Sequence, residues 1–471
     1  MATERQPVGT VVRRSVAAVG IAGGLWWGYR SGGIGLLAAA AVAGAALVGA
    51  VLLRRRRRAV GPLRTNQPTA MPGMLTAAAG VLAATVVWNA TSLLAYAVPD
   101  NGDRFSSRVA TWGRDHGYGP VIDWLEARAY STPPSKEPAT DLGLATVPAT
   151  VPATLPATVP STPPTTASGT NTTVGGSTAP TTTAPPAPGA PAALTPVFSP
   201  PLEGEGQWVT VASAGGAEAM WATSMRPLSA AGGVVATMVV IDQTHLRAGL
   251  FNGSELPGGT WQRGNRVPKD LQPALVAAMN GGFRLDHIKG GYMTEGVVVK
   301  PLRTGDATLA IDRAGRLVLG VLGRDLFDDG SWASMRQNLE LMVDGGRSNV
   351  RAGTAHGVWW GADNGNAVYV KRSAVCTVTD GRVAYVMADP VDAEQFAQSL
   401  IAMGCVNAIQ MDINVDWPLF TTFTHDTGAA VPHFVDRRMT GNARRALDGS
   451  TKDFFAFFDS TSVPAGTALD A

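Results

Sequence analysis

The residues best suited to chemistry lie on one short stretch near the C-terminus. Five apolar residues alternate there with four polar ones, in the order Ile409, Gln410, Met411, Asp412, Ile413, Asn414, Val415, Asp416, Trp417. Successive side chains of a β-strand point to opposite faces, so the stretch predicts one apolar face and one face with two acids and two amides. Such a polar row favours a pocket, and the solvated outer face of a sheet is the alternative.

The order Asp412-x-Asn414-x-Asp416 also matches the first three ligand positions of an EF-hand calcium loop. The match ends there, because Trp417 stands where the loop needs glycine and Phe423 stands where it needs glutamate. We therefore predict no metal site and no cofactor, and leave open only a divalent cation bound to this polar face.

Two glycine pairs are flanked by polar residues, and the first pair follows a predicted strand. Asn280-Gly281-Gly282-Phe283 follows the apolar run 275–279, and Asp344-Gly345-Gly346-Arg347 occurs later in the chain. Adjacent glycines let a ligand approach the backbone, and an asparagine at a strand end can present its amide. An isolated Asn-Gly is usually only a turn. Together with Glu295-Gly296, these residues predict a site built from loops over a sheet.

The order of these motifs resembles the phosphodiester glycosidase family. The resemblance rests on Asn280–Phe283, on Arg372-Ser373-Ala374, and on the strand 407–412 that closes with Asp412 after a capped helix, and it covers roughly residues 230–460. The family usually has a glycine run and a serine after that aspartate, whereas Ile413-Asn414-Val415-Asp416 follow here, so we expect a different pocket floor.

The resemblance implies hydrolysis of a sugar C1–O–phosphate linkage. Glycoside hydrolysis commonly uses two carboxylates around an oxocarbenium-like transition state, and arginine stabilises phosphate charge. Asp412 is then the acid/base or stabilising carboxylate and Arg372 holds the phosphate, with a structural ion pair as the alternative for Arg372. Glu295 and Asp344 are candidates for a second carboxylate. Further binding candidates are Asn280, Gly281, Gly282, Gln410, Asn414 and Asp416.

Residues 201–471 have the patterns of a β-rich α+β domain with few helices. Strands are predicted at 234–241, 275–279, 307–311, 317–321, 368–370 and 375–378. Asp380-Gly381 predicts a hairpin between 375–379 and 383–387. One helix is clear, because Asp392 and Gln395 form a capping box and Gly404 ends it.

Residues 1–100 carry the signals of a membrane region. Apolar stretches at 32–53 and 71–98 are long enough to cross a bilayer, and Arg54–Arg58 mark the cytoplasmic side. The stretch 15–29 is shorter, so two or three transmembrane helices both fit. In either case we expect a cell-membrane protein whose domain 201–471 is extracytoplasmic.

Two segments join the membrane region to the domain. Residues 101–131 predict an amphipathic helical segment, which either lies on the outer membrane face or docks as an ordinary helix. Residues 132–200 hold 16 of the 32 prolines and repeat Val-Pro-Ala-Thr, which predicts a disordered Pro/Thr/Ala-rich linker acting as a spacer. Cys376 and Cys405 are the only cysteines, and a disulfide and two buried free thiols are both open.

The sequence therefore favours a membrane-tethered extracytoplasmic hydrolase for sugar-1-phosphodiester linkages of envelope glycans. The alternative is a non-catalytic protein that binds wall glycans or assists envelope assembly. Expected partners are a carbohydrate or glycosyl-phosphate polymer and the membrane. The formal net charge is only +2, which gives no indication of nucleic-acid binding.

Overall fold

The computed structural model describes residues 86, 88–96, 105–145, 189–355, 357–358, 360–361, 368–425 and 428–471. The chain divides into two compact units, 1–130 and 131–471. The predicted membrane stretches 15–29 and 32–53, and most of 71–98, lie outside the described residues. Within the described part of the chain, every helix is too short or too polar to span a bilayer.

The first unit contains a pair of short helices, α4 (Phe105–Asp115) and α5 (Gly119–Ala129). The Arg114 guanidinium joins them, because it lies 3.1 Å from a carboxylate oxygen of Asp123 and 2.5 Å from one of Glu126. The helical character predicted for 101–131 is therefore present. Its contact with a membrane face stays a prediction.

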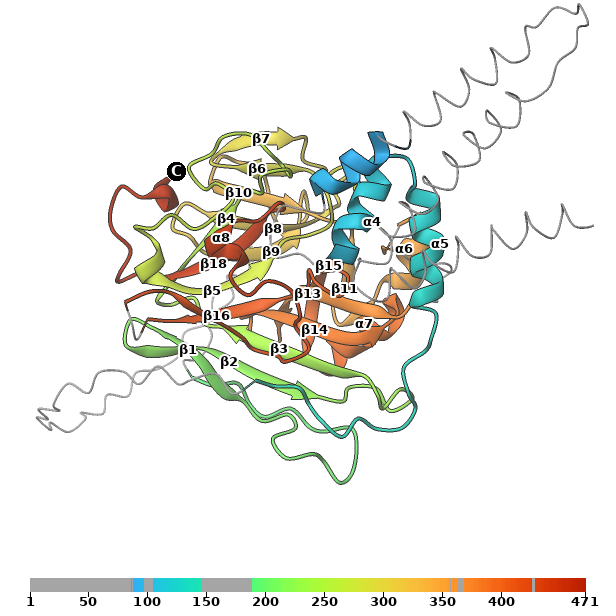
Figure 1. The fold of residues 1–471 in the computed structure, drawn as a ribbon. Helices are drawn as coiled ribbons and strands as arrows, with labels where there is room; N and C mark the ends of the chain where they lie inside the picture. Colours follow the sequence, from blue (N-terminus) through green and yellow to red (C-terminus); the bar gives the residue numbers. More distant parts are fainter. Residues whose placement is uncertain are drawn as a thin grey trace, which may run out of the picture. The chain divides into compact units, whose positions relative to one another are not determined.

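The second unit is built on three antiparallel sheets, and the largest has eight strands (Figure 1). Its strands in spatial order are β1 (Val209–Ala214), β2 (Ala217–Met225), β3 (Val235–Ile241), β14 (Val383–Val391), β13 (Val370–Val378), β15 (Cys405–Ile413), β11 (Leu341–Asp344) and β12 (Arg347–Ser348). The predicted run 375–378 lies in β13, whereas only Val370 of the predicted run 368–370 does. The Asp380-Gly381 hairpin joins β13 to β14 as expected.

The two other sheets have five strands each. One runs in the order β7 (Val297–Lys300), β6 (Tyr292–Thr294), β10 (Trp332–Gln337), β8 (Ala307–Asp312) and β9 (Leu317–Val321). The other runs in the order β17 (Val431–Phe434), β16 (Phe420–Thr424), β5 (Leu275–Asn280), β18 (Phe454–Asp459) and β4 (Leu246–Phe251). β18, the last strand of the chain, therefore occupies an interior place beside β5.

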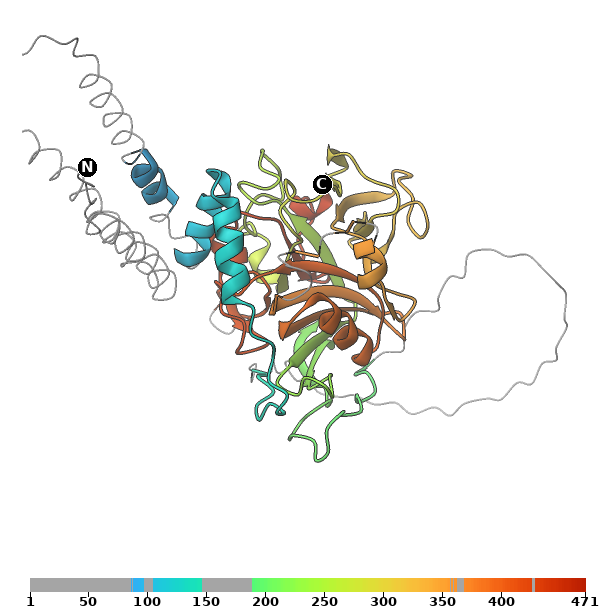
Figure 2. The same cartoon turned by 90° about the vertical axis from the view of Figure 1, so that its right-hand side faces the viewer.

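Helices are few, which confirms the β-rich α+β class. They are α6 (Val350–Ala355), α7 (Ala393–Ala402), α8 (Arg445–Asp448) and the 3₁₀ turns η1 (Gln272–Ala274) and η2 (Ala468–Asp470). α7 has the predicted capping box: the Asp392 carboxylate accepts from the Gln395 amide, and the Gln395 side chain accepts from the Asp392 amide. α7 lies against the large sheet (Figure 2).

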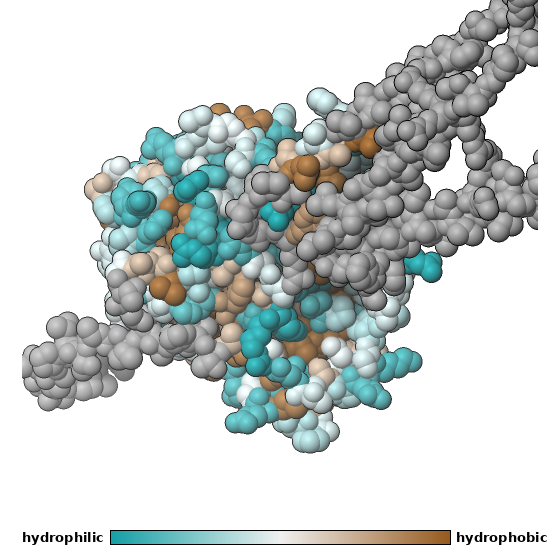
Figure 3. Space-filling view, in the orientation of Figure 1, coloured by the Kyte–Doolittle hydropathy of each residue, from teal (hydrophilic) through white to brown (hydrophobic). Residues whose placement is uncertain are grey.

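Apolar side chains fill the spaces on both sides of the large sheet. One cluster, which includes Met279, Tyr385, Ile409 and Phe455, joins strands of all three sheets. A second cluster packs Phe396 and Leu400 of α7 onto the other face. The surface is mixed in character, and an apolar patch lies over the edge strand β7, where Val297, Val298 and Val299 are exposed (Figure 3).

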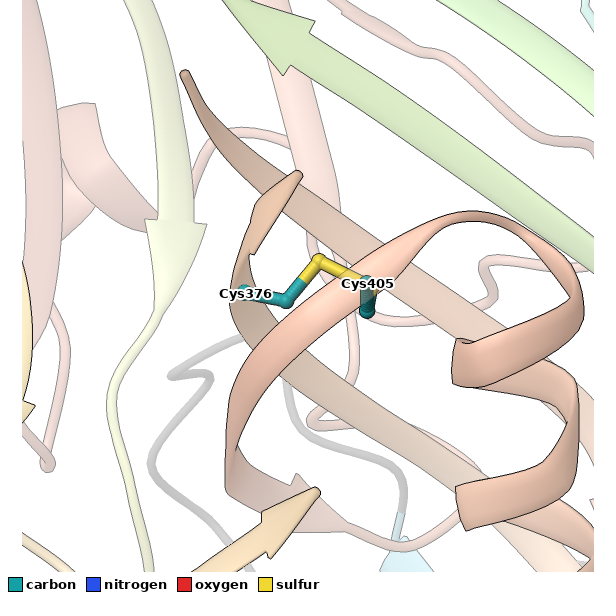
Figure 4. The surroundings of a disulfide bond; sticks show 2 residues. All are labelled: Cys376 and Cys405. Carbon is teal, nitrogen blue, oxygen red and sulfur yellow. A yellow bond between two sulfur atoms is a disulfide. The ribbon is translucent and has the colours of Figure 1, made fainter. Parts of the chain in front are cut away.

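A disulfide joins Cys376 of β13 to Cys405 at the start of β15 (Figure 4). The two Cα atoms are 5.7 Å apart, within the normal range for a bridge. The two strands are direct neighbours, with Cys376 paired to Ala408. Of the two alternatives that the sequence left open, the structure has the disulfide.

Part of the predicted linker is folded onto the domain. Residues 131–145 belong to the second compact unit, as do 189–200. The Ala139 amide donates to the Gly232 carbonyl over 2.8 Å, and the Ala145 amide donates to the Val435 carbonyl over 3.0 Å. Residues 146–188, which hold the repeat, lie outside the described residues.

Candidate active site

Asp412 lies where two sheets meet. It is next to last in β15, and its amide donates over 3.2 Å to the carbonyl of Gly281, which directly follows β5. Its carbonyl accepts from the Ser373 hydroxyl of β13 over 2.7 Å. Asp412 is only 6% exposed. The position of its carboxylate is thus fixed by the backbones of two sheets.

The Asp412 carboxylate forms an ion pair with Lys452, whose Nζ lies 2.7 Å from Oδ2. Lys452 comes from the loop just before β18, and its Nζ also lies 4.0 Å from the centre of the Trp417 ring. The Arg445 guanidinium lies 4.0 Å from the same ring. An aromatic face attracts cations, so the Trp417 ring contacts two positive groups, of which Lys452 pairs with Asp412.

The Asn280 side chain links neighbouring parts of the fold by hydrogen bonds. Its side-chain NH₂ donates to the Gly281 carbonyl and to the Ser373 hydroxyl, and its Oδ1 accepts from the Tyr385 hydroxyl and the Leu419 amide. Burial raises the pKa of Tyr385, so its hydroxyl remains a donor. All hydrogen-bonding capacity of the Asn280 amide is used within the fold.

The glycine pair makes room for a buried ion pair. Arg336 and Asp453 are almost fully buried, with Nε 2.9 Å from Oδ2. A Cβ on Gly281 would lie 2.3 Å from Asp453 Oδ2, and one on Gly282 would lie 3.1 Å from the Arg336 guanidinium carbon. The packing of this ion pair therefore explains why Gly281 and Gly282, which were predicted to bind substrate, carry no side chain. The Asp453 carboxylate is already paired with Arg336.

Arg372 is fully buried in the position that the sequence assigned to a phosphate ligand. Its guanidinium donates to the carbonyls of Val391 and Trp360 and to the Gln410 side-chain oxygen. Gln410 is equally buried, and its NH₂ donates to the Trp360 carbonyl. These contacts orient the backbone behind β15, and neither side chain lies at the surface.

The alternation ends at Asn414. Its φ is +124°, so the chain leaves the extended conformation and β15 stops at Ile413. The Asn414 side-chain oxygen accepts from the amide of Asp416, which is fully buried. The row of four polar residues therefore does not continue as one strand face, and the two last members belong to a turn.

Each of the two candidates for a second carboxylate has a partner other than Asp412. Asp344 ends β11 beside the beginning of β15, where Val343 pairs with Ala408, so about four residues of strand at ~3.3 Å each separate it from Asp412. Its carboxylate binds Arg324 over 2.7 Å. Glu295 lies in the turn between β6 and β7 and accepts from the Arg263 amide over 2.7 Å.

Further charged residues surround Lys371, whose side chain contacts the turn that follows Asp412. The Lys371 ammonium donates to the Val415 carbonyl over 3.0 Å. Burial lowers the pKa of Lys371, and Asp389, Asp436 and Asp416 oppose this effect. Burial also raises the pKa of half-buried Asp389, whereas the positive charges of Lys371 and Arg438 act to lower that pKa.

A narrow pocket opens beside the site. It is lined by Asn280, Trp417, Arg445, Ser450 and Asp453, among others, and offers about 10 Å³ of space to a water-sized molecule. That is room for about one water and not for a sugar ring. Among the described residues, no three His, Cys, Asp or Glu side chains are grouped so as to hold a metal ion.

Sequence reasoning missed the cations of the site. Lys452 lies just before the aromatic run 454–458, which was not predicted as a strand. Recognising that strand would have been the one signal for Lys452. Trp417 was assigned to the apolar face, and Arg445 carried no signal. The resulting arrangement has one carboxylate paired with Lys452, and a second cation, Arg445, on the same Trp417 ring. It is suited to a reaction in which positive charge develops on one part of the substrate and negative charge on another.

Comparison with known proteins gives one family. Residues 274–412 match the phosphodiester glycosidase family, which confirms the resemblance, and the matched segment ends at Asp412. No protein of curated function matches the chain.

Solved structures were compared as well. The catalytic domain of zebrafish N-acetylglucosamine-1-phosphodiester α-N-acetylglucosaminidase, auto-inhibited by its pro-peptide, is 15% identical with a TM-score of 0.35 over 52% of this chain and 87% of its own. A hypothetical protein from Synechocystis is 11% identical with a TM-score of 0.36 over 53% and 64%. A putative exported protein from Burkholderia pseudomallei is 11% identical with a TM-score of 0.27 over 50% and 75%. These values carry no information on function.

Proposed function

We propose, because residues 274–412 match the phosphodiester glycosidase family, that this protein hydrolyses sugar-1-phosphodiester linkages of envelope glycans. The family match supports a glycosidase of this general type. The observation that carries the proposal is that the matched segment ends at a nearly buried carboxylate, Asp412, held beside the cation Lys452.

The roles follow from the charges. Asp412 stabilises the developing oxocarbenium ion or takes a proton from the attacking water. Lys452 neutralises the phosphate oxygens as the C1–O bond breaks, the role first expected of Arg372. A phosphate monoester is a good leaving group, so the reaction depends less on a second carboxylate acting as general acid. Arg372, Gln410 and Asn280 position the strands that hold Asp412.

The test is a turnover assay on the full-length protein. It uses an α-N-acetylglucosamine-1-phosphodiester and purified wall polymers, each with and without chelator. Release of free sugar together with a phosphomonoester supports the proposal, and the Asp412→Asn variant is the control for contaminating activity. If chelator abolishes the activity and a divalent cation restores it, the reaction also needs the cation that the sequence left open.

A second function has one observation in its favour. The pocket lined by Asn280, Trp417 and Asp453 has room for about one water, and the amides and glycines expected to bind sugar are used inside the fold. A glycan-binding or envelope-assembly protein would need no larger cavity. Saturable binding of wall polymer without any release of sugar, at all substrate and cation concentrations, would favour this alternative.

We also propose that the protein is anchored in the cell membrane with residues 131–471 outside the cytoplasm. The supporting observations are Arg54–Arg58 between two apolar stretches, and the disulfide of the domain, which persists in oxidising compartments. All six lysines lie between Lys136 and Lys452. An impermeant amine reagent applied to intact cells should therefore label internal lysines of the domain, and labelling only after lysis would contradict this orientation.

A further inference from the structure

We propose that residues 131–145, called here the strap, hold the domain 189–471 to the N-terminal region without any help from residues 146–188. On this view the domain stays attached to the N-terminal region even when the Pro/Thr repeat is cut. The proposal is independent of the enzymatic activity, because it concerns only the docking of the strap on the domain.

The strap is bound by backbone hydrogen bonds at two places. At the first, the Ala139 amide donates to the Gly232 carbonyl over 2.8 Å, and the Gly233 amide donates to the Ser135 carbonyl over 2.9 Å. At the second, the Arg437 amide donates to the Gly143 carbonyl over 2.9 Å. Leu144 forms a bridge with Asp436 there. Two-ended pairing of this kind fixes the register of the strap.

The domain surface has the shape that the strap requires. A Cβ on Gly232 would lie 2.8 Å from the Cα of Pro138 and 2.9 Å from the carbonyl oxygen of Lys136. A Cβ on Gly233 would lie 3.0 Å from the Ser135 carbonyl oxygen. These neighbours are backbone atoms, which cannot move aside as a side chain can. The glycine pair thus allows close passage of the strap.

Side chains add to the attachment unequally. Arg226 donates to the Ala139 carbonyl over 3.3 Å, and it is held in place by a buried ion pair with Glu205. The ion pair between Asp141 and Arg437 is largely exposed, so it contributes little. The backbone contacts and the glycine pair therefore provide most of the specificity.

The segment 146–188 begins and ends on the same unit. It follows Ala145, which is bonded to Val435, and it returns at Gly189, whose carbonyl accepts from Arg382 over 2.7 Å. The covalent path from α5 to the domain runs directly through Tyr130 and Ser131 into the strap. A cut within 146–188 therefore leaves two fragments that remain associated. No disulfide joins them, because Cys376 and Cys405 both lie in the second fragment.

The test uses the full-length protein with a specific protease site substituted for a few residues near 166 and an affinity tag at the N-terminus. After cleavage under native, reducing conditions, the C-terminal fragment, which contains residues 189–471, should be retained with the tagged fragment and should separate only in denaturant. Release of the domain on cleavage of the otherwise unchanged protein would overturn the proposal.

Two glycine variants show which contacts hold the fragments together. Gly232→Ala forces a Cβ against the strap backbone and should release at least about tenfold more domain after cleavage. Gly264→Ala is the matched control, because its Cβ would meet nothing nearer than 3.7 Å, and it should behave as the unchanged protein. Equal retention of the two variants would refute the assigned docking surface.

Hydrogen exchange provides a test that needs no substitution in the domain. In the uncut protein, the amides of Ala139 and Ala145 should exchange on the order of 100-fold more slowly than in an unstructured chain, because both donate to the domain. Exchange at the free-chain rate would show that the strap is not docked, even if Gly232→Ala failed to fold.

Discussion

The ion pair between Asp412 and Lys452 allows the proposed role of Asp412 to be separated from a purely structural one. Asp412→Asn preserves the size of the side chain and removes its charge. The side chains of Asp412 and Lys452 are 8% and 14% exposed, so the lysine would be left nearly buried without its partner. Breaking a buried pair typically costs about 3–5 kcal/mol. Because the pair retains some exposure and Trp417 still faces the ammonium, we expect a loss of ~2–3 kcal/mol in the free energy of unfolding.

The double variant distinguishes charge from packing. Lys452→Met alone leaves the Asp412 carboxylate without its cation, so we expect a comparable loss of stability. Asp412→Asn combined with Lys452→Met removes both charges, and the two losses should not add. The coupling free energy, obtained from urea unfolding of all four proteins, should be ~1–3 kcal/mol.

Turnover on an α-N-acetylglucosamine-1-phosphodiester, corrected for the folded fraction, gives the functional answer. Asp412→Asn should lower the rate by about 10³-fold or more, which corresponds to ~4 kcal/mol of transition-state stabilisation. Lys452→Met should lower it as well, because the phosphate loses its cation. If the folded fraction of Asp412→Asn retains the unchanged rate, the pair is structural and the reasoning about the site is wrong.

Three further predictions concern stability. The double variant Cys376→Ser/Cys405→Ser should lose ~3.5 kcal/mol in the free energy of unfolding measured with urea, because the bridge closes a loop with a sequence separation of 29. Equal stability of the unchanged protein with and without reductant would contradict this. Gly281→Ala should lower the free energy of unfolding by about 3 kcal/mol, since its Cβ would lie 2.3 Å from Asp453 Oδ2. Asp389→Asn should stabilise the protein at pH 7, because burial raises the pKa of Asp389 in the folded state.

The sign of the Asp389 effect follows from proton binding. The folded state holds the Asp389 proton more tightly than the unfolded state, so the stability that this group contributes is present below its ordinary pKa of 3.8. That contribution is lost as the pH rises through the raised folded pKa. Urea unfolding should therefore show the gain from Asp389→Asn at pH 7 and its disappearance toward pH 4. A gain of the same size at both values would point to packing.

The glycine prediction has the same control as the strap. Gly264→Ala adds a methyl group where contacts are ordinary, so its urea midpoint should match that of the unchanged protein within error. If Gly281→Ala unfolds at the same midpoint as this control, the Arg336–Asp453 pair is free to move aside, and the close approach does not explain the glycine.

Sequence patterns predicted the elements whose signals are local. The Asp380-Gly381 turn and the Asp392–Gln395 capping box both depend on a few neighbouring residues, whereas the cysteine count left the disulfide open. The family resemblance likewise came from short motifs in a fixed order.

The predictions for single site residues could not include what surrounds each side chain in the fold. Arg372 has the charge that a phosphate needs, yet the sequence does not show that carbonyl oxygens surround it. Asn280 and the Gly281-Gly282 pair follow a strand as expected, but their partners Tyr385 and Asp453 lie far along the chain. Lys452 was missed for the same reason, since its pairing with Asp412 exists only after β18 is in place.

The position of β18 (Phe454–Asp459) has a consequence for folding during synthesis. It lies between β5 and β4, with Phe454 paired to both Asn280 and Phe251. The ribosome makes these two partners long before β18, so their facing edges stay unpaired until β18 has been made. Contacts of such high sequence separation form slowly. The domain therefore cannot finish folding before β18 has been made, and loss of residues 452–459 would remove an interior strand together with both Lys452 and Asp453.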